Sequence, residues 1–375
     1  MSFFDDASLV MIPSGYKDQK VYSVKPIDGT GDLTFTRSND TASRVNSSGL
    51  IEKVRQNQYY KSTAFTTSSL FATYNVSPVS LGTYPVDSSS LGYSFSITGT
   101  NQGFIVQLPN DTNIRSVSVY LKDWNAVDLY WTGSAPITTI SDSGTINGYK
   151  RYVVVIPAGA NNLYFRPNSN SGTATTVYAT APQIENGDYP TAYIVNDTTA
   201  SAVSVGPVSG LPRLDYSGGA TCPSLKLEPQ RSNLCLWSEQ ADQYTKARAT
   251  IGSNVAVSPD GYTNADSLIE DGSTDSHVFY NFGLTTFSVQ SYTASVFAKK
   301  GSRDWVALQM YWGTNVLAYF NLNTGVVGTV TAGATATITP YGNGWYRCSI
   351  TATAAANGGG IAIYSANADN SISYA

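Results

Sequence analysis

The sequence predicts an all-β protein in which two tandem β-sandwiches follow a short N-terminal region. The chain has 375 residues, of which 42% are hydrophobic and only 13% charged, and it contains 26 Tyr, 32 Gly and 16 Pro. This composition favours short strands and turns over helices. A series of phrases also occurs twice in the same order, which indicates that one folding unit is duplicated.

The repeat is clearest in the phrase DWNAVDLYW at 123–131, which shares both ends with DWVALQMYW at 304–312. The offset between matching phrases only increases along the chain, as loop insertions in the second copy would cause. We therefore expect residues 55–196 and 231–375 to form two sandwiches of the same topology. The other matches are EKVRQNQYYKS (52–62) with EPQRSNLCLWS (228–238), SVYLK (118–122) with SVFAK (295–299), NGYKRYVVVIPA (147–158) with NGWYRCSITATA (343–354), and NNLYFRPNSNSG (161–172) with GGIAIYSANADN (359–370).

The repeat also sets the expected domain boundaries. Residues 1–50 belong to neither copy, 51–196 form the first module, 197–218 read as a Gly/Ser/Pro-rich linker, and 219–375 form the second module. The first copy ends with YATAPQIENGDYPTAYIVN (178–196), and the second stops at SISYA, before any equivalent. The second module is therefore expected to be incomplete at its C-terminus by at least one strand.

Within each copy the local pattern is that of strands. RSVSVYLK, YKRYVVVIPA, SYTASVFAK and WYRCSITATA are alternating or β-branched runs, which is typical of strands. SPDG, NTG and YGNG are turn signals between such runs. The N-terminal 50 residues contain short apolar runs, SLVMIP and KVYSV, but too few residues for a good core. We expect them to be an attachment region that is ordered by other chains.

The repeated phrase supplies the candidate site, because successive strand side chains point to opposite faces. One face carries Val127, Leu129 and Trp131 in the first copy, and the second copy matches it with another apolar set, Leu308, Met310 and Trp312. This face is predicted to be core. The opposite face places two aromatic rings beside a polar residue in each copy: Trp124, Asp128 and Tyr130 in the first, and Trp305, Gln309 and Tyr311 in the second.

Aromatic rings beside a carboxylate or amide suit a sugar, because the ring covers its C–H face and the polar group binds its hydroxyls. The alternative is that these rings pack under a loop or against a neighbouring subunit, which is the commoner role of large aromatics in sandwiches. Sequence alone leaves both open.

No catalytic residues, cofactor or metal site are predicted. His277 is the only histidine, so histidine-based triads are nearly excluded, and we expect this residue to lie on the surface. A glycosidase needs only two carboxylates, so this class of enzyme stays open.

Net charge is −4, without basic runs or a long apolar stretch, so neither nucleic acid nor membrane insertion is expected. The NADN stretch at 367–370 is expected to be a turn rather than a calcium loop. Cys222, Cys235 and Cys348 form no CxxC spacing and predict neither a disulfide framework nor a zinc site.

Several stretches resemble a known group of proteins. The opening SLVMIPSGYKDQKVYSVKPIDGTGDLTFTRSN and SRVNSSGLIEK are similar to the N-terminal regions of fibre and adhesin proteins in the virions of tailed bacteriophages, including crAss-like phages. PRLDY, CPSLKLEPQRSNLCLWSE, SPDGYTNADSLIED, YTASVFAKKGS and GNGWYRCSIT resemble the carbohydrate-binding-type jelly rolls of those proteins. The resemblance covers almost the whole chain, and the first module departs from it most.

This resemblance implies a non-enzymatic structural protein of the virion, a head or tail fibre. It implies a homotrimer whose N-terminal region binds capsid or tail proteins and whose distal part faces the host and its surface glycans. Two alternatives remain: a capsule-degrading tailspike whose catalytic part lies beyond residue 375, and a secreted carbohydrate-binding protein.

Overall fold

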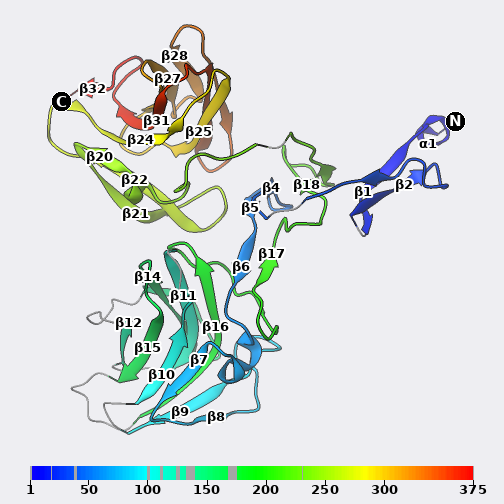
Figure 1. Cartoon of the computed structure of the whole chain (residues 1–375), viewed down its shortest axis with the longest axis vertical. Helices are drawn as coiled ribbons and strands as arrows, with labels where there is room; N and C mark the ends of the chain where they lie inside the picture. Colours follow the sequence, from blue (N-terminus) through cyan, green and yellow to red (C-terminus); the bar gives the residue numbers. More distant parts are fainter. Residues whose placement is uncertain are drawn as a thin grey trace. The chain divides into compact units, whose positions relative to one another are not determined.

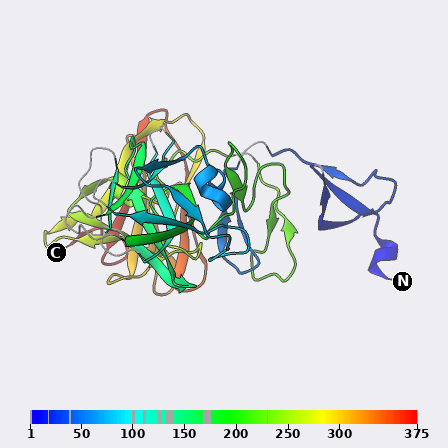
Figure 2. The same ribbon diagram turned by 90° about the horizontal axis from the view of Figure 1, so that it is seen from below.

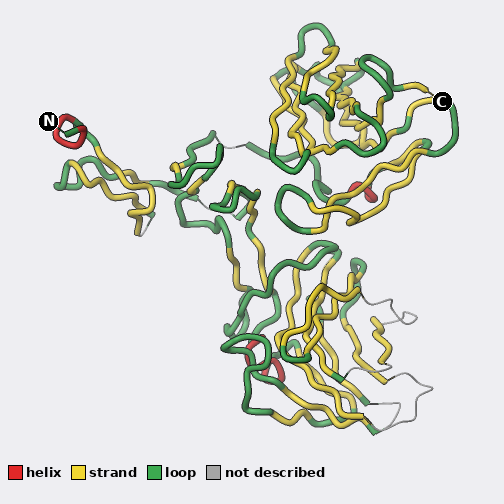
Figure 3. The backbone as a smooth tube through the Cα atoms, turned by 180° about the vertical axis from the view of Figure 1, so that it is seen from behind, coloured by secondary structure: helices red, strands yellow, loops and turns green. Residues whose placement is uncertain are grey.

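The computed structural model shows a chain built almost entirely of strands (Figure 3). Its strands and short helices are labelled in Figure 1. The chain divides into two compact units, Met1–Lys226 and Leu227–Ala375. The structure describes residues 2–17, 19–37, 40–98, 102–109, 113–123, 127–131, 140–167, 175–229 and 231–374.

The N-terminal region is a small antiparallel sheet (dark blue in Figure 2). Asp32 ties it together by accepting hydrogen bonds from the Ser23 backbone N–H (2.9 Å) and hydroxyl (3.1 Å). Val21 is fully buried, whereas Ile12, Tyr22 and many other apolar side chains of this region are exposed. The elements are α1 (Phe3–Asp6), β1 (Val10–Lys17), β2 (Lys20–Lys25) and β3 (Leu33–Thr34).

The stretch 197–218 is not a free linker, because it pairs with residues 37–57 of the same unit. Val45 N–H donates to the Asp215 carboxylate (2.7 Å), and Arg213 Nε donates to the Ser43 carbonyl (2.5 Å). A run rich in Gly, Ser and Pro looks like a linker, but here its backbone forms ladders with a distant segment. The paired strands are β4 (Ser43–Val45) with β5 (Ile51–Lys53), β6 (Arg55–Asn57) with β17 (Val203–Val205), and β18 (Leu214–Asp215) with β19 (Ser224–Leu225).

The first sandwich packs a four-stranded sheet on a six-stranded one. The four-stranded sheet has the order β12 (Val127–Trp131), β15 (Asn162–Pro167), β10 (Gly103–Gln107), β7 (Phe71–Tyr74). The six-stranded sheet has the order β13 (Ile140–Ile146), β14 (Tyr149–Ile156), β11 (Arg115–Lys122), β16 (Thr175–Asn186), β9 (Tyr93–Ile97), β8 (Pro78–Ser80). The helix η1 (Ser62–Thr67) contributes Phe65 to a core in which aromatic rings meet in series: Phe65, Phe71, Phe95, Phe104 and Phe165.

The second sandwich has a six-stranded sheet opposite smaller sheets. The large sheet has the order β20 (Thr245–Ala247), β24 (Val278–Thr286), β31 (Gly358–Ala366), β26 (Trp305–Tyr311), β27 (Asn315–Asn321), β28 (Val326–Val330). The remaining elements are the sheet β25 (Ser291–Lys299), β30 (Trp345–Thr353), β29 (Thr335–Pro340), the hairpin β21 (Ala249–Val257) with β22 (Thr263–Glu270), the pair β23 (Asp275–Ser276) with β32 (Ser373–Tyr374), and η2 (Ala241–Gln243).

The matched strands of the two sandwiches have the same order, while β27 and β28 of the second have no counterpart among the described strands of the first. β12-β15-β10-β7 corresponds to β26-β31-β24-β20, and β13-β14-β11 corresponds to β29-β30-β25. The register is also the same: Tyr120 lies opposite Arg151 in the first module, and Phe297 lies opposite Arg347 in the second. The chain is therefore a tandem pair of all-β sandwiches, as the repeated phrases predict. Strand β16 of the first module has no counterpart in the described part of the second.

Candidate functional site

The first-module site residues fall largely outside what the structure describes. Trp124 lies outside the described residues. Asp128 and Tyr130 belong to β12, where their backbones pair with Arg166 and Tyr164, but their side chains are outside the described part. The predicted site residues whose side chains are described, Trp305, Gln309 and Tyr311, all belong to the second module.

In the second module, β26 has the predicted core face. Leu308, Met310 and Trp312 are all buried in the core cluster between the sheets. Trp305, Ala307, Gln309 and Tyr311 alternate with them, so their side chains lie on the outer face of the large sheet. The period of two in the repeated phrase thus gave the correct division between inner and outer side chains.

Gln309 lies at the centre of this outer face and is only 4% exposed. Its Oε1 accepts a hydrogen bond from the Tyr364 hydroxyl (2.6 Å), and its Nε2 donates to Asn315 Oδ1 (2.7 Å). Burial raises the pKa of Tyr364, so this hydroxyl stays protonated and can donate. Gln309 therefore fixes Tyr364 and Asn315 in place rather than presenting a free amide.

Tyr311 belongs to a group of rings at one end of the outer face. Its ring centroid lies 5.2 Å from that of Phe282 on β24, and Phe282 stacks with Tyr280 at 4.9 Å. Phe282 is 36% exposed, whereas Tyr280 and Tyr311 are half-buried. Gly360 belongs to β31, which lies between β24 and β26, and a Cβ at this position would be 1.7 Å from the Asn281 carbonyl oxygen. A glycine is therefore required where β24 and β31 approach this closely. We call Tyr280, Phe282 and Tyr311 the aromatic face.

Trp305 lies at the opposite end of the outer face and is packed by its own chain. It is half-buried against a cluster that contains Ala307, Tyr319 and Ala366. Its ring would lie 2.6 Å from a Cβ on Gly328. Asp369, from the predicted turn, accepts hydrogen bonds from the backbone N–H (2.7 Å) and hydroxyl (3.0 Å) of Thr329. This end of the face is therefore covered, and Tyr311 is the predicted aromatic that remains beside an exposed ring.

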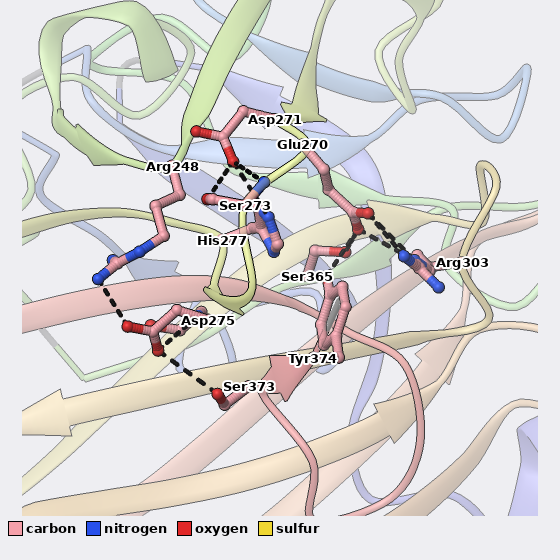
Figure 4. Close-up of polar contacts among 11 residues, drawn as sticks. Arg248, Glu270, Asp271, Ser273, Asp275, His277, Arg303, Ser365, Ser373 and Tyr374 are labelled. Atoms are coloured by element: carbon pink, nitrogen blue, oxygen red, sulfur yellow. Dashed lines mark hydrogen bonds and ion pairs between the residues drawn. The ribbon is translucent and has the colours of Figure 1, made fainter.

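A polar cluster joins the end of β22 to β31 and β32 (Figure 4). Arg303 donates to both carboxylate oxygens of Glu270, at 2.9 to 3.2 Å, and Ser365 and Tyr374 also donate to this carboxylate. Burial by itself raises the pKa of Glu270, but these hydrogen bonds and the arginine charge lower it to about 2. Because every partner stabilises the ionised form, the cluster is suited to holding strands together rather than to acid–base chemistry.

His277 lies beside this cluster, and the expectation that it is on the surface is wrong. The residue is 1% exposed. The pairing of β23 with β32 brings Tyr374 over its ring, with 5.0 Å between centroids, and its Nε2 lies 3.5 Å from Asp271 Oδ1. No local pattern indicates this burial, because the residue that covers the ring lies almost a hundred positions further along the chain.

Within the residues that the structure describes, no three His, Cys, Asp or Glu side chains converge as a metal site would. The cysteines Cys222, Cys235 and Cys348 are free thiols. No helix in the described part of the chain is long and apolar enough to cross a bilayer.

The sequence missed several members of the outer face, namely Tyr280, Phe282, Asn315 and Tyr364. A signal for two of them was present, because Tyr280 and Phe282 alternate along one strand in HVFYNFGL and therefore share a face. The other two depend on which strands become neighbours of β26, and no local pattern encodes this.

Comparison with known proteins gives matches among solved structures only. The N-terminal CBM22-1–CBM22-2 tandem domain of Paenibacillus barcinonensis Xyn10C matches with 11% identity and a TM-score of 0.25, covering 88% of this chain and 91% of that one. Vicilin from Capsicum annuum matches with 9% identity and a TM-score of 0.11, covering 84% and 87%. No family model and no curated protein matches the chain. Both TM-scores are low, so the fold assignment rests on the strand orders.

Proposed function

We propose that the outer face of the second sandwich binds a carbohydrate, and that the chain is a non-catalytic, structural fibre protein of a virion. The observation that carries the binding proposal is the aromatic face together with the fixed polar groups beside it. Phe282 and Tyr311 offer adjoining ring surfaces, on which the C–H face of a sugar ring can stack. Asn315 and Tyr364 lie beside them as hydrogen-bonding groups that Gln309 holds in position.

The polar side chains of this face favour a neutral sugar. Gln309, Asn315 and the Tyr364 hydroxyl carry no charge, since burial raises the tyrosine pKa. Amide and hydroxyl groups can both donate to and accept from sugar hydroxyls. A site whose polar groups are already fixed also loses less side-chain entropy on binding. We therefore place the uncharged part of a host-surface glycan on this face.

The binding proposal is tested with the full chain on an array of bacterial surface polysaccharides. We expect Phe282→Ala and Tyr311→Ala each to weaken binding by about fivefold or more, since a lost aromatic contact is worth about 1 kcal/mol. Tyr84→Ala is the matched control, because Tyr84 is an exposed tyrosine of the first module. Equal binding by all three variants would contradict the proposal. Release of free sugars from the polysaccharide would instead favour a depolymerase.

The fibre proposal rests on the resemblance of the N-terminal region and on its apolar surface. Many large apolar side chains in this region are exposed, including Leu9, Ile12, Tyr22, Val24 and Ile27. An exposed apolar surface on so small a sheet marks an interaction site. We propose that it attaches to capsid or tail proteins, and that the chain acts as a homotrimer, which would cover this surface and stiffen the fibre.

Removing residues 2–34 tests the attachment. This deletion spares the segment 37–57, which pairs within the first unit, so we expect both sandwiches to unfold at unchanged temperatures. We expect the shortened chain to be absent from purified particles and to lose trimers in analytical sedimentation. Normal incorporation into particles would refute the attachment role.

A further inference from the structure

The second sandwich has two free strand edges where the first has a shared central strand. In the first module, β16 pairs antiparallel with β11 on one side and with β9 on the other. In the second, β25 pairs with β30 and β22 pairs with β21. Within residues 227–229 and 231–374, neither β25 nor β22 has a strand on its other edge. We call this pair of edges, which have no strand between them in the described residues, the strand gap.

Burial changes at matched positions beside the gap. Val117 of β11 is 1% exposed and its counterpart Ala294 is 9% exposed, while Val119 is buried and its counterpart Val296 is only half-buried. The burial of the outward-facing arginine–serine pair differs more between the modules. Arg151 donates to Ser118 (2.9 Å) in a buried contact, whereas the matching bond from Arg347 to Ser295 (3.3 Å) is exposed. The second module therefore keeps the same contact without the cover that the first module has.

The repeated phrase R-x-N-x-x-x-x-S shows the same loss of partners. In the first module, Asn57 donates to the Ile194 carbonyl (2.7 Å), and the Ser62 hydroxyl accepts from Asn196 N–H (2.9 Å). Asn57 and Ser62 are fully buried by this closing segment. Their counterparts, Asn233 and Ser238, are exposed and hydrogen-bond to each other (2.8 Å). Asn233 and Ser238 therefore match the residues that bind the closing segment in the first module, but no described residue of the second module covers them.

The two sides of the gap are held near both ends of the hairpin. Glu270, the last residue of β22, is fixed by Arg303 and Tyr374 (Figure 4). At the hairpin's other end, Trp345 Nε1 donates to the Val257 carbonyl (3.0 Å). Edges held in this way lose little further freedom when a strand enters between them, which favours strand addition.

We propose that the strand gap between β25 and β22 binds one extended polypeptide segment with the chemistry of residues 175–196. The segment enters as a strand antiparallel to both edges, beside Tyr374, and then folds back over Asn233 and Ser238. Its inward positions are small or branched apolar residues, as Val177, Ala179 and Ile184 are in the first module. Its returning part carries a polar residue that satisfies the exposed asparagine and serine.

The test is hydrogen exchange on the full chain, with a synthetic peptide of residues 175–196 as the probe. Without peptide, the amides of β25 that point away from β30 should exchange at least about tenfold faster than the matching amides of β11. Added peptide should slow them to the β11 rate. The control peptide carries Val177→Pro and Ala179→Pro, which remove ladder donors, and should have no effect. A fusion variant, in which residues 175–196 are joined to the chain after Tyr374, tests the same contact without requiring tight binding of a separate peptide.

Three results would overturn the proposal. The first is slow exchange of the β25 edge in the chain alone at low concentration, which would mean that the gap is already filled. The second is slowing that depends on the concentration of the unmodified chain, which would assign the gap to a second copy. The third is unchanged exchange with both the peptide and the joined segment.

Discussion

Asn57 and Asn233 occupy the same place in a repeated phrase but have opposite environments. Asn57 is fully buried and bonded to the closing segment of its module, whereas Asn233 is exposed and bonded to Ser238. A repeated side chain therefore shows that two modules descend from one pattern, but its role depends on what covers it.

The aromatic residues of the two modules differ in the same way. The first module places a series of phenylalanines, including Phe95 and Phe104, inside the core. The second core cluster combines Phe287, Trp312 and Phe320 with several alanines, and Phe282 and Tyr311 lie on the outer face. Where rings lie inside, they stabilise the fold; where they lie outside, they are available for a ligand.

The largest effect expected from this comparison is on stability. Phe104 is buried among other rings, so Phe104→Ala should lower the free energy of unfolding of the first module by about 3–5 kcal/mol. Phe282→Ala, at a half-open surface, should cost the second module less than about 1 kcal/mol. Calorimetry that resolves the two transitions measures both. Comparable losses would show that Phe282 is a core residue and not part of a binding face.

The second effect concerns Glu270. Its pKa of about 2 lies below the ordinary value of 4.5, so its stabilising contribution is present above pH 4.5 and is lost as the pH falls towards 2. Glu270→Gln should remove that pH dependence from the second module and cost about 1–3 kcal/mol at pH 7. Urea titrations at several pH values provide the measurement. An unchanged acid profile would mean that the carboxylate is not held by Arg303 in solution.

The third effect tests the matched asparagines directly. Asn57→Ala removes the acceptor of Tyr59 N–H and leaves buried backbone groups unpaired, so it should cost about 1–3 kcal/mol. Asn233→Ala, at an exposed site, should cost less than about 0.5 kcal/mol. The difference is read from paired denaturation curves. Equal costs would indicate that Asn233 is buried in solution by a segment already present.

Much of the fold follows from local pattern. Strand runs, turns and the repeat predict two sandwiches of one strand order, and alternation along β26 separates Leu308 and Met310 from Gln309. The partners of Gln309 could not be predicted, because Tyr364 and Asn315 lie on neighbouring strands. The burial of His277 beneath Tyr374 and the pairing of 197–218 with 37–57 escaped prediction for the same reason: contacts between distant segments decide them.

The measurement that tests the proposed function most directly is a structure of the full chain bound to the oligosaccharide that scores highest on the array. We predict one sugar ring stacked on Phe282 and Tyr311, with its hydroxyls within hydrogen-bonding distance of Asn315 or Tyr364. A sugar bound elsewhere on the chain, with Phe282 and Tyr311 untouched, would contradict the account.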